Sequence, residues 1–187
     1  MKMKEAPSVD NQAFLYDFFG DIEEPNRILI WRMRKKDGEF FKESRWFSSA
    51  HDASLFANSP VCQDCDVYFG LGVAPRDYGP HNRCPASEVV AISGFWLDVD
   101  IKGDNHADQN LPPDEAAAMA LLAEFPLEPS FVVRSGGGMH AYWKFVEPWT
   151  FDTIAERRRG GEATKAFVDI LGTHCLSRMG ITPVGAF

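Results

Sequence analysis

Residues 88–101 read EVVAISGFWLDVDI, an apolar run that ends in two aspartates. β-Branched and aromatic residues dominate this run, which predicts a long and largely buried strand. Side chains alternate between the faces of a strand, so Asp98 and Asp100 share one face, and we expect Leu97 and Val99 to point into the core. Two carboxylates on one face repel each other unless a cation lies between them, and Mg²⁺ or Mn²⁺ suits such oxygen ligands. The alternative is a pair of acids at the solvated end of a strand.

Downstream of this strand the sequence predicts a helix, a hairpin and a second helix. Prolines and acids at residues 112–115 are typical of a first helical turn. The remaining expected elements are hairpin strands at 130–135 and 139–146 and a mostly helical segment at 151–179, with breaks at Gly160 and Gly161 or at Gly172. From residue 88 the order is β-α-β-β-α, which is the order of RRM-like and ferredoxin-like domains without their last strand. We therefore expect an α+β core of this type.

The expected hairpin contains a second group of reactive side chains. Residues 134–144 read RSGGGMHAYWK, and three glycines allow the backbone to approach a ligand and to present its N–H groups to an anion. His140 and Lys144 share one strand face with the residue between them, Tyr142. A three-residue loop places Arg134 opposite His140, and a four-residue loop places Ser135 there, so both registers put a phosphate-binding donor beside the histidine. The alternative is a tight hairpin with a structural histidine.

Upstream, residues 1–60 predict a small αβ module packed on a core domain of residues 61–187. The expected elements are a helix at 11–20, a strand at 27–34, a turn at 36–38, a return strand at 39–47, a helix at 51–58, a strand at 66–74 and a loop at 75–87. A unit of about 60 residues is marginal on its own, so we expect the module to pack on the rest of the chain.

Composition limits the classes of function. The chain has 187 residues and a net charge of −8, which argues against a protein held to DNA by bulk positive charge. Two basic clusters, at residues 32–36 and 157–159, form either a local basic groove, with Arg32 and Arg34 as candidates, or solvated faces. No apolar run is long enough for a membrane span, and four cysteines without an export signal indicate the reducing cytoplasm.

Three of these cysteines and one histidine have a spacing that resembles a zinc site. Cys62 and Cys65 form a C-x₂-C pair, and His81 and Cys84 form an H-x₂-C pair. The expected strand at 66–74 separates its own ends by roughly 25–30 Å, so the following loop would have to fold back to close the site. Structural Zn²⁺ and two unrelated reduced cysteine sites are both open at this stage.

Together, the aspartate pair and the glycine-histidine hairpin resemble the motifs of the archaeo-eukaryotic primase superfamily. The resemblance is to the primase-polymerases of phages, plasmids and related mobile elements in particular. The resemblance covers residues 66–146 and rests on DVYFGLGVAPR, GFWLDVDIKG and PSFVVRSGGGMHAYW. It implies a nucleotidyltransferase that works as DNA primase or DNA polymerase. In this family two acids bind catalytic Mg²⁺ or Mn²⁺, which corresponds to Asp98 and Asp100. A serine and a histidine grip the phosphates of the incoming dNTP or NTP, which corresponds to Ser135 and His140.

The resemblance has further implications for partners and for a third acid. It implies a single-stranded DNA template and a helicase as a domain or separate protein, and our strand assignment adds Arg134 and Lys144 as helpers in phosphate binding. The family's third motif is an apolar residue followed by Asp, which we expect beyond Phe187. Asp169 matches the bare pattern, but it lies in a helical segment. The alternative function is a truncated or degenerate module that binds nucleotide or DNA without synthesis.

Overall fold

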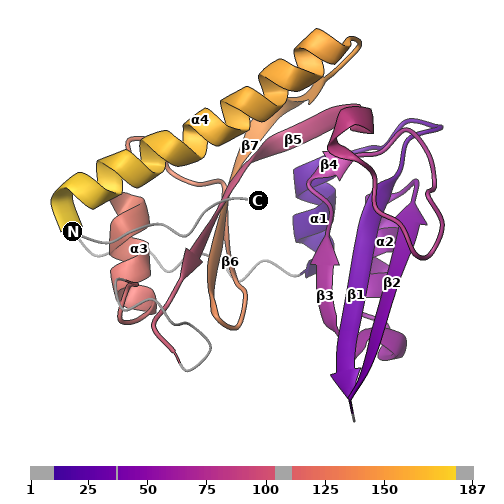
Figure 1. Cartoon of the computed structure of the whole chain (residues 1–187), viewed down its shortest axis with the longest axis horizontal. Helices are drawn as coiled ribbons and strands as arrows, with labels where there is room; N and C mark the ends of the chain where they lie inside the picture. Colours follow the sequence, from indigo (N-terminus) through magenta and orange to yellow (C-terminus); the bar gives the residue numbers. More distant parts are fainter. Residues whose placement is uncertain (1–10, 37, 104–110, 180–187) are drawn as a thin grey trace. The chain divides into compact units, whose positions relative to one another are not determined.

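Residues 11–36, 38–103 and 111–179 are described by the structure, which is a computed structural model (Figure 1). The fold is mixed α+β, with antiparallel strand pairs. The chain divides into two compact units, Met1–Ser93 with Glu147–Arg157 and Gly94–Val146 with Arg158–Phe187. It therefore passes between the units three times, and two strands and one helix belong to both. No helix within the described ranges is long and apolar enough to cross a membrane.

The first unit contains a three-stranded sheet in the order β2-β1-β3. Its elements are α1 (Asn11–Phe19), β1 (Ile28–Lys36), β2 (Glu39–Phe47), α2 (Ala50–Ala57) and β3 (Asp66–Phe69). The expected helix at 11–20, the hairpin and the helix at 51–58 are confirmed. Gly38 closes the hairpin with a φ of 83°, a conformation that suits glycine. The hairpin register then runs from Ile28 opposite Phe47 to Lys36 opposite Glu39.

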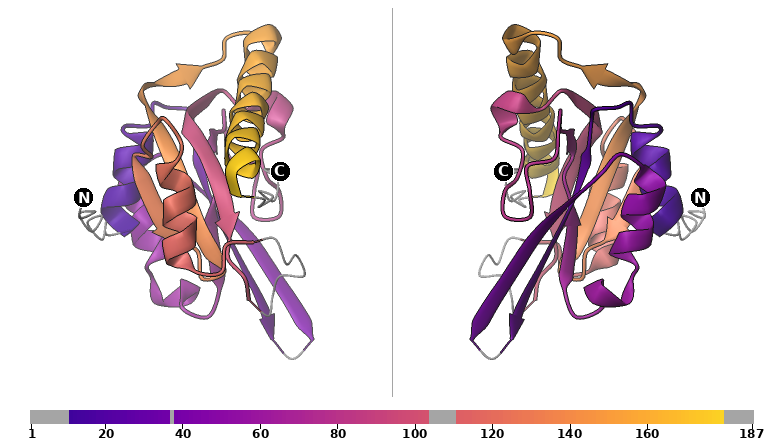
Figure 2. Two further views of the ribbon diagram at one scale, coloured as in Figure 1. Left: turned by 90° about the vertical axis from the view of Figure 1, so that its left-hand side faces the viewer. Right: turned by 90° about the vertical axis from the view of Figure 1, so that its right-hand side faces the viewer.

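Helices α1 and α2 cover one face of this sheet. Phe14, Phe18 and Phe19 of α1 surround Phe69 of β3 with ring centroids 5.4, 6.1 and 5.9 Å away. On β2, Phe47 packs at 5.4 Å against a phenylalanine of α2, Phe56. These aromatic contacts bury Ile28 and Ile30 between sheet and helices, which makes the core of this unit. The tip of the β1–β2 hairpin extends past both helices (Figures 1 and 2).

The expected strand at 66–74 is wrong in one respect, because the structure divides it. β3 ends at Phe69 and pairs with β1, whereas β4 (Gly72–Val73) pairs with β5 (Ala91–Asp100). The break lies at Gly70, where a Cβ would be 3.1 Å from the Cβ of Leu29. The chain thus leaves one sheet and enters another within three residues, which an unbroken strand cannot do.

The elements of the second unit begin with β5. Those that follow it are α3 (Glu115–Ala123), β6 (Phe131–Arg134), β7 (Gly138–Thr150) and α4 (Ile154–Met179), and the three strands are neighbours in the order β5-β7-β6. Asp114 caps α3 by accepting a hydrogen bond from the Ala117 N–H at 2.8 Å. The expected break in the last helix is wrong, because α4 continues through all three glycines. Packing of Val168 and Leu171 stabilises the helix despite them.

Helices α3 and α4 lie on one face of the strands of this unit, as the left view of Figure 2 shows. Leu97 and Val99 of β5 pack there with Ala141 and Trp143 of β7, as the alternation predicts. The same cluster contains residues of both helices and the residues that follow α3: Ala118, Leu121, Leu122, Phe125, Val168 and Leu171. Alternation therefore directs the intervening residues of β5 and β7 to the opposite face of the sheet.

Candidate functional site

The face of β5 and β7 opposite the helices brings the two predicted motifs together. The Ile101 N–H donates to the Gly137 carbonyl at 3.1 Å, and a Cβ on Gly94 would lie 2.4 Å from the Trp143 carbonyl oxygen. The two strands therefore run antiparallel, in a register that places Asp98 opposite His140. Their side chains meet, with the histidine Nε2 3.4 Å from the aspartate Oδ1.

Tyr142 extends this pair into a line of three polar groups. Its hydroxyl lies 3.3 Å from His140 Nδ1. The tyrosine is only 2% exposed, and burial raises its pKa well above the usual range, with the nearby Asp98 charge adding to the effect. The hydroxyl therefore stays protonated at neutral pH, and it can donate to Nδ1 when the neutral imidazole carries its proton on Nε2. Trp96 packs edge-on against the same imidazole at 5.5 Å.

Asp98 has an unsatisfied oxygen at this point. Its Oδ1 is buried and has no hydrogen-bond partner among the described residues, although the His140 ring is near. A buried carboxylate oxygen without a donor is costly unless a cation or a donor from a ligand reaches it. Asp100 follows two residues later, and so on the same face. The residues present thus fit a hard divalent cation held by the two carboxylates and completed by water and phosphate oxygens.

The hairpin register differs from both expected registers. Val133 lies opposite His140 and Arg134 opposite Met139, because the loop between the paired residues Ser135 and Gly138 contains only two glycines. The Ser135 N–H donates to the Gly138 carbonyl at 2.9 Å. Two-residue loops of this kind are common in hairpins, and Gly136 has the positive φ, 90°, that they require.

This register separates Arg134 from the histidine. Because Arg134 is paired with the core residue Met139, it lies on the helix side of the sheet, where its Nε is 2.8 Å from Glu115 of α3. Its side chain is 76% exposed. Ser135 and Lys144 share the face of His140, but the lysine is four residues along β7, about 13 Å away. Of the predicted phosphate-binding residues, the structure therefore places His140 beside Asp98, with Ser135 on the same face of the sheet.

Gly138 has a function that sequence reasoning did not assign to it. A Cβ at this position would lie 2.4 Å from the Val99 carbonyl oxygen and 2.9 Å from the Asp100 Cα. Glycine therefore allows β7 to approach β5 beside the second acid. The run of three glycines signalled a loop, but only the pairing of the strands shows that the third belongs to the sheet.

The cysteine and histidine set does not assemble into a metal site. Within the described ranges, no group of three or more His, Cys, Asp or Glu residues is placed to hold a metal ion. Cys62, Cys65 and Cys84 are all free thiols, and burial raises the pKa of the Cys84 thiol. That shift opposes the thiolate form that zinc binds. Among the described residues, Asp98 and Asp100 do not belong to such a group of three either, so a cation there needs oxygen atoms from water or substrate.

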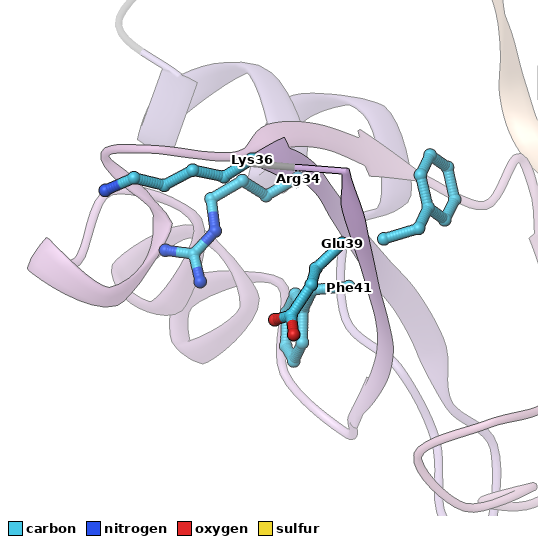
Figure 3. Close-up of a pocket in the computed structure, with 5 residues that line it drawn as sticks. Arg34, Lys36, Glu39 and Phe41 are labelled. Atoms are coloured by element: carbon cyan, nitrogen blue, oxygen red, sulfur yellow. The ribbon is translucent and has the colours of Figure 1, made fainter.

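Three arginines of the two basic clusters have polar structural partners. Arg32 is largely buried and bonds through its guanidinium to Glu43 at 2.6 Å and to the Val61 carbonyl. Arg157 donates to the Val89 carbonyl at 2.6 Å, and Arg158 lies 3.5 Å from Glu162. Arg34 is exposed and lines an open pocket of about 520 Å³ on the hairpin, which Figure 3 shows with the side chains of Lys36, Glu39 and Phe41.

Asp169 is not part of the acidic site. It lies on α4, is 63% exposed, and pairs with Lys165 at 2.7 Å. Its neighbours Val168 and Leu171 pack on the core face of the sheet, and Asp98 lies on the other face. Among the described residues, the open face of this unit therefore has two acids from the predicted motifs and no third from α4.

Comparisons of this chain with models of known families, with curated proteins and with solved structures found no match.

Proposed function

We propose that this protein is the catalytic domain of a primase-polymerase, which joins nucleotides on a single-stranded DNA template. The observation that supports this best is the placement of Asp98, Asp100, Ser135 and His140 on one sheet face, where Asp98 Oδ1 is buried and has no hydrogen-bond partner among the described residues. A carboxylate pair beside a phosphate-binding histidine is the minimal equipment for phosphoryl or nucleotidyl transfer.

Asp98 and Asp100 would hold Mg²⁺ or Mn²⁺. The bound cation would neutralise charge on the triphosphate and favour ionisation of the attacking hydroxyl. In the reaction a 3′-hydroxyl forms a bond to the α-phosphorus of the incoming dNTP or NTP, the bond from that phosphorus to the bridging oxygen breaks, and pyrophosphate leaves. The hydroxyl proton passes to solvent.

The remaining residues would bind and orient the triphosphate. Tyr142 would hold the His140 ring with its proton on Nε2, so that this nitrogen would donate to a phosphate oxygen that enters beside Asp98. Ser135 and the N–H groups of the glycine loop would donate to the other phosphate oxygens. Lys144 supplies a more distant positive charge, whereas Arg134 would have to leave Glu115 to take part. Tyr142 is nearly inaccessible and is an unsuitable contact for the sugar 2′ position.

The proposal also covers the type of core fold, the cellular compartment and a further partner. The strand order β5-β7-β6 with α3 and α4 on one face agrees with an RRM-like or ferredoxin-like core. We propose that it works in the cytoplasm and that a helicase is a further partner.

A second candidate function is favoured by the position of Asp169. With this acid on the helix-covered side, Asp98 and Asp100 are the two acids from the predicted motifs that share the open face. A domain with two carboxylates can bind a metal–nucleotide complex and yet fail to position the attacking hydroxyl. The alternative is thus a module that binds nucleotide or DNA without synthesis.

Primer synthesis tests the proposal. The chain is incubated with unprimed single-stranded DNA, labelled NTPs or dNTPs, and Mg²⁺ or Mn²⁺, in parallel with the Asp98→Ala/Asp100→Ala variant. Products that disappear in the variant support a primase-polymerase. Metal-dependent nucleotide binding without products supports the second candidate, and the absence of both synthesis and binding refutes both functions.

A further inference from the structure

The three-stranded sheet of the first unit has a second face, which α1 and α2 do not cover. By the strand register, Trp31 lies opposite Tyr68 on this face, Met33 opposite Lys42, and Lys35 opposite Phe40, so these side chains share one side. Residues of the other parity, such as Ile30 and Phe69, face the helices. We call the set Trp31, Lys35, Phe40, Lys42, Tyr68 and Arg83 the aromatic face.

Aromatic rings and cations alternate on this face. Trp31 and Tyr68 have ring centroids 5.1 Å apart, and the Arg83 guanidinium lies 5.3 Å from the Trp31 ring. Lys42 Nζ lies 4.6 Å from the Phe40 ring. Trp31, Lys42 and Arg83 also line a pocket of about 240 Å³.

Exposure distinguishes these rings from core residues. Phe40 is 50% exposed and Tyr68 is 45% exposed, whereas the aromatic residues of α1 on the opposite side are mostly buried. Exposed aromatic groups that gather on one face are typical of an interaction surface, whereas singly exposed ones are common. Phe40 and Trp31 lie in neighbouring strands about four residue steps apart, roughly 13 Å, so they are spaced to contact different groups of one extended ligand.

The charge of this region has the opposite sign to that of the whole chain. Residues 28–47 contain six Lys or Arg and three Asp or Glu, a net charge of +3, whereas the chain has −8. Glu43, one of the three acids, pairs with Arg32 and Arg45 on the helix side. On the aromatic face itself Lys35, Lys42 and Arg83 outnumber the one strand acid, Asp66. An anionic ligand with planar apolar groups fits this combination.

We propose that the aromatic face binds single-stranded nucleic acid, with bases stacked on Phe40, Tyr68 and Trp31 and phosphates beside Lys35, Lys42 and Arg83. Stacking on aromatic side chains combined with a positive track is the general way in which proteins bind single strands without sequence preference. The inference deepens the proposed function, because it names a surface for the template strand. It does not depend on catalysis, since all its residues lie in the first unit and the acids lie in the second.

Fluorescence anisotropy of the full chain with a labelled oligothymidine of about 20 nucleotides tests the proposal. The test variant is Phe40→Ala/Lys42→Ala, which removes one exposed ring and its cation. We expect it to weaken binding about tenfold or more. The matched control is Tyr16→Ala/Lys165→Ala, an exposed ring and an exposed lysine elsewhere, which we expect to change affinity less than about twofold. Thermal unfolding verifies that both variants are folded.

The outcomes separate this inference from the proposed function. Unchanged affinity in the folded Phe40→Ala/Lys42→Ala variant overturns the inference, as does equal affinity for duplex DNA, whose bases cannot stack on side chains. If Asp98→Asn protein binds the oligothymidine as the wild type does, binding is independent of the acids. Absence of synthesis by the wild-type chain with oligothymidine binding intact contradicts only the proposed function, and synthesis with binding indifferent to Phe40 and Lys42 contradicts only the aromatic face.

Discussion

In each unit, helices cover one face of a sheet, and the other face presents the side chains at alternate strand positions. The two faces opposite the helices differ in chemistry. In the second unit Asp98, His140 and Tyr142 form a line with distances of 3.4 and 3.3 Å, and the tyrosine is buried. In the first unit the groups are rings and long cations, with Phe40 and Tyr68 about half exposed.

The difference indicates different uses for the same kind of scaffold. Short polar side chains fixed by neighbours can hold a reacting group in one geometry, which catalysis requires. Exposed rings and lysines tolerate many ligand positions, which suits binding without sequence preference. A single substitution should therefore change activity strongly on the face with the acids, and should change affinity only moderately on the aromatic face.

The largest effect is expected from Asp98→Asn. The amide cannot supply the charge that a divalent cation needs, so primer synthesis should fall by about 10³-fold or more. The matched control is Asp169→Asn, which makes the same chemical change on the exposed surface of α4 and should leave synthesis unchanged. A loss of synthesis in both variants would contradict the division between the two sides of the sheet. It would show that Asp169 participates in the reaction.

The next largest effect is a loss of stability, which is compared between a glycine of the β6–β7 hairpin and one of the β1–β2 hairpin. Gly138→Ala places a Cβ 2.4 Å from the Val99 carbonyl oxygen, so strands β5 and β7 must separate, and we expect the unfolding free energy to fall by about 3 kcal/mol. Gly38→Ala at the tip of the β1–β2 hairpin meets open space and has only the strain of a positive φ, about 1 kcal/mol. Urea unfolding of both variants measures these values. Equal losses would mean that the close approach of β5 and β7 is not required.

A smaller effect is expected from Tyr142→Phe, which removes the hydroxyl next to His140 Nδ1. We expect a 10-fold to 100-fold loss of synthesis, the usual range for a partner that orients a functional histidine. Nitrogen NMR of labelled histidine gives the independent readout, because the Nε2–H tautomer should dominate in the wild type and become mixed in the variant. Tyr16→Phe, on an exposed tyrosine, is the control. An unchanged tautomer would refute the orienting function of Tyr142.

The sequence predicted the elements of both units and the shared face of the acids, because strand alternation is a local property. The apolar run before Asp98 and Asp100 indicated a buried strand, and the two-residue alternation of side chains along a strand placed both acids on one face. The hairpin register could not be derived in this way, because it depends on how many glycines join the loop and how many join the strand. This is why Arg134 and Ser135 were the expected partners of His140, whereas Val133 lies opposite it.

The division of residues 66–74 between two sheets was also beyond a local reading. Gly70 ends β3 where the chain packs against Leu29, a contact between segments about 40 residues apart in the sequence. The aromatic face was missed for the same reason. Residues 32–36 showed a basic cluster, but Tyr68 and Arg83 lie near it only through strand pairing and the following loop. The signal that could have indicated it is the alternation of Trp31, Met33 and Lys35.

The smallest expected effect concerns salt dependence and sharpens the contrast between the two faces. Each phosphate contact of a cation releases about one counterion, so Lys42→Ala should reduce the slope of log affinity against log salt for oligothymidine by about 1. Asp98→Asn removes no phosphate contact on the aromatic face and should leave the slope unchanged. Titrations between about 50 and 200 mM salt measure both slopes. A slope that changes with Asp98→Asn and not with Lys42→Ala would assign the nucleic acid to the second unit. In that case the aromatic face would not be a separate site for nucleic acid.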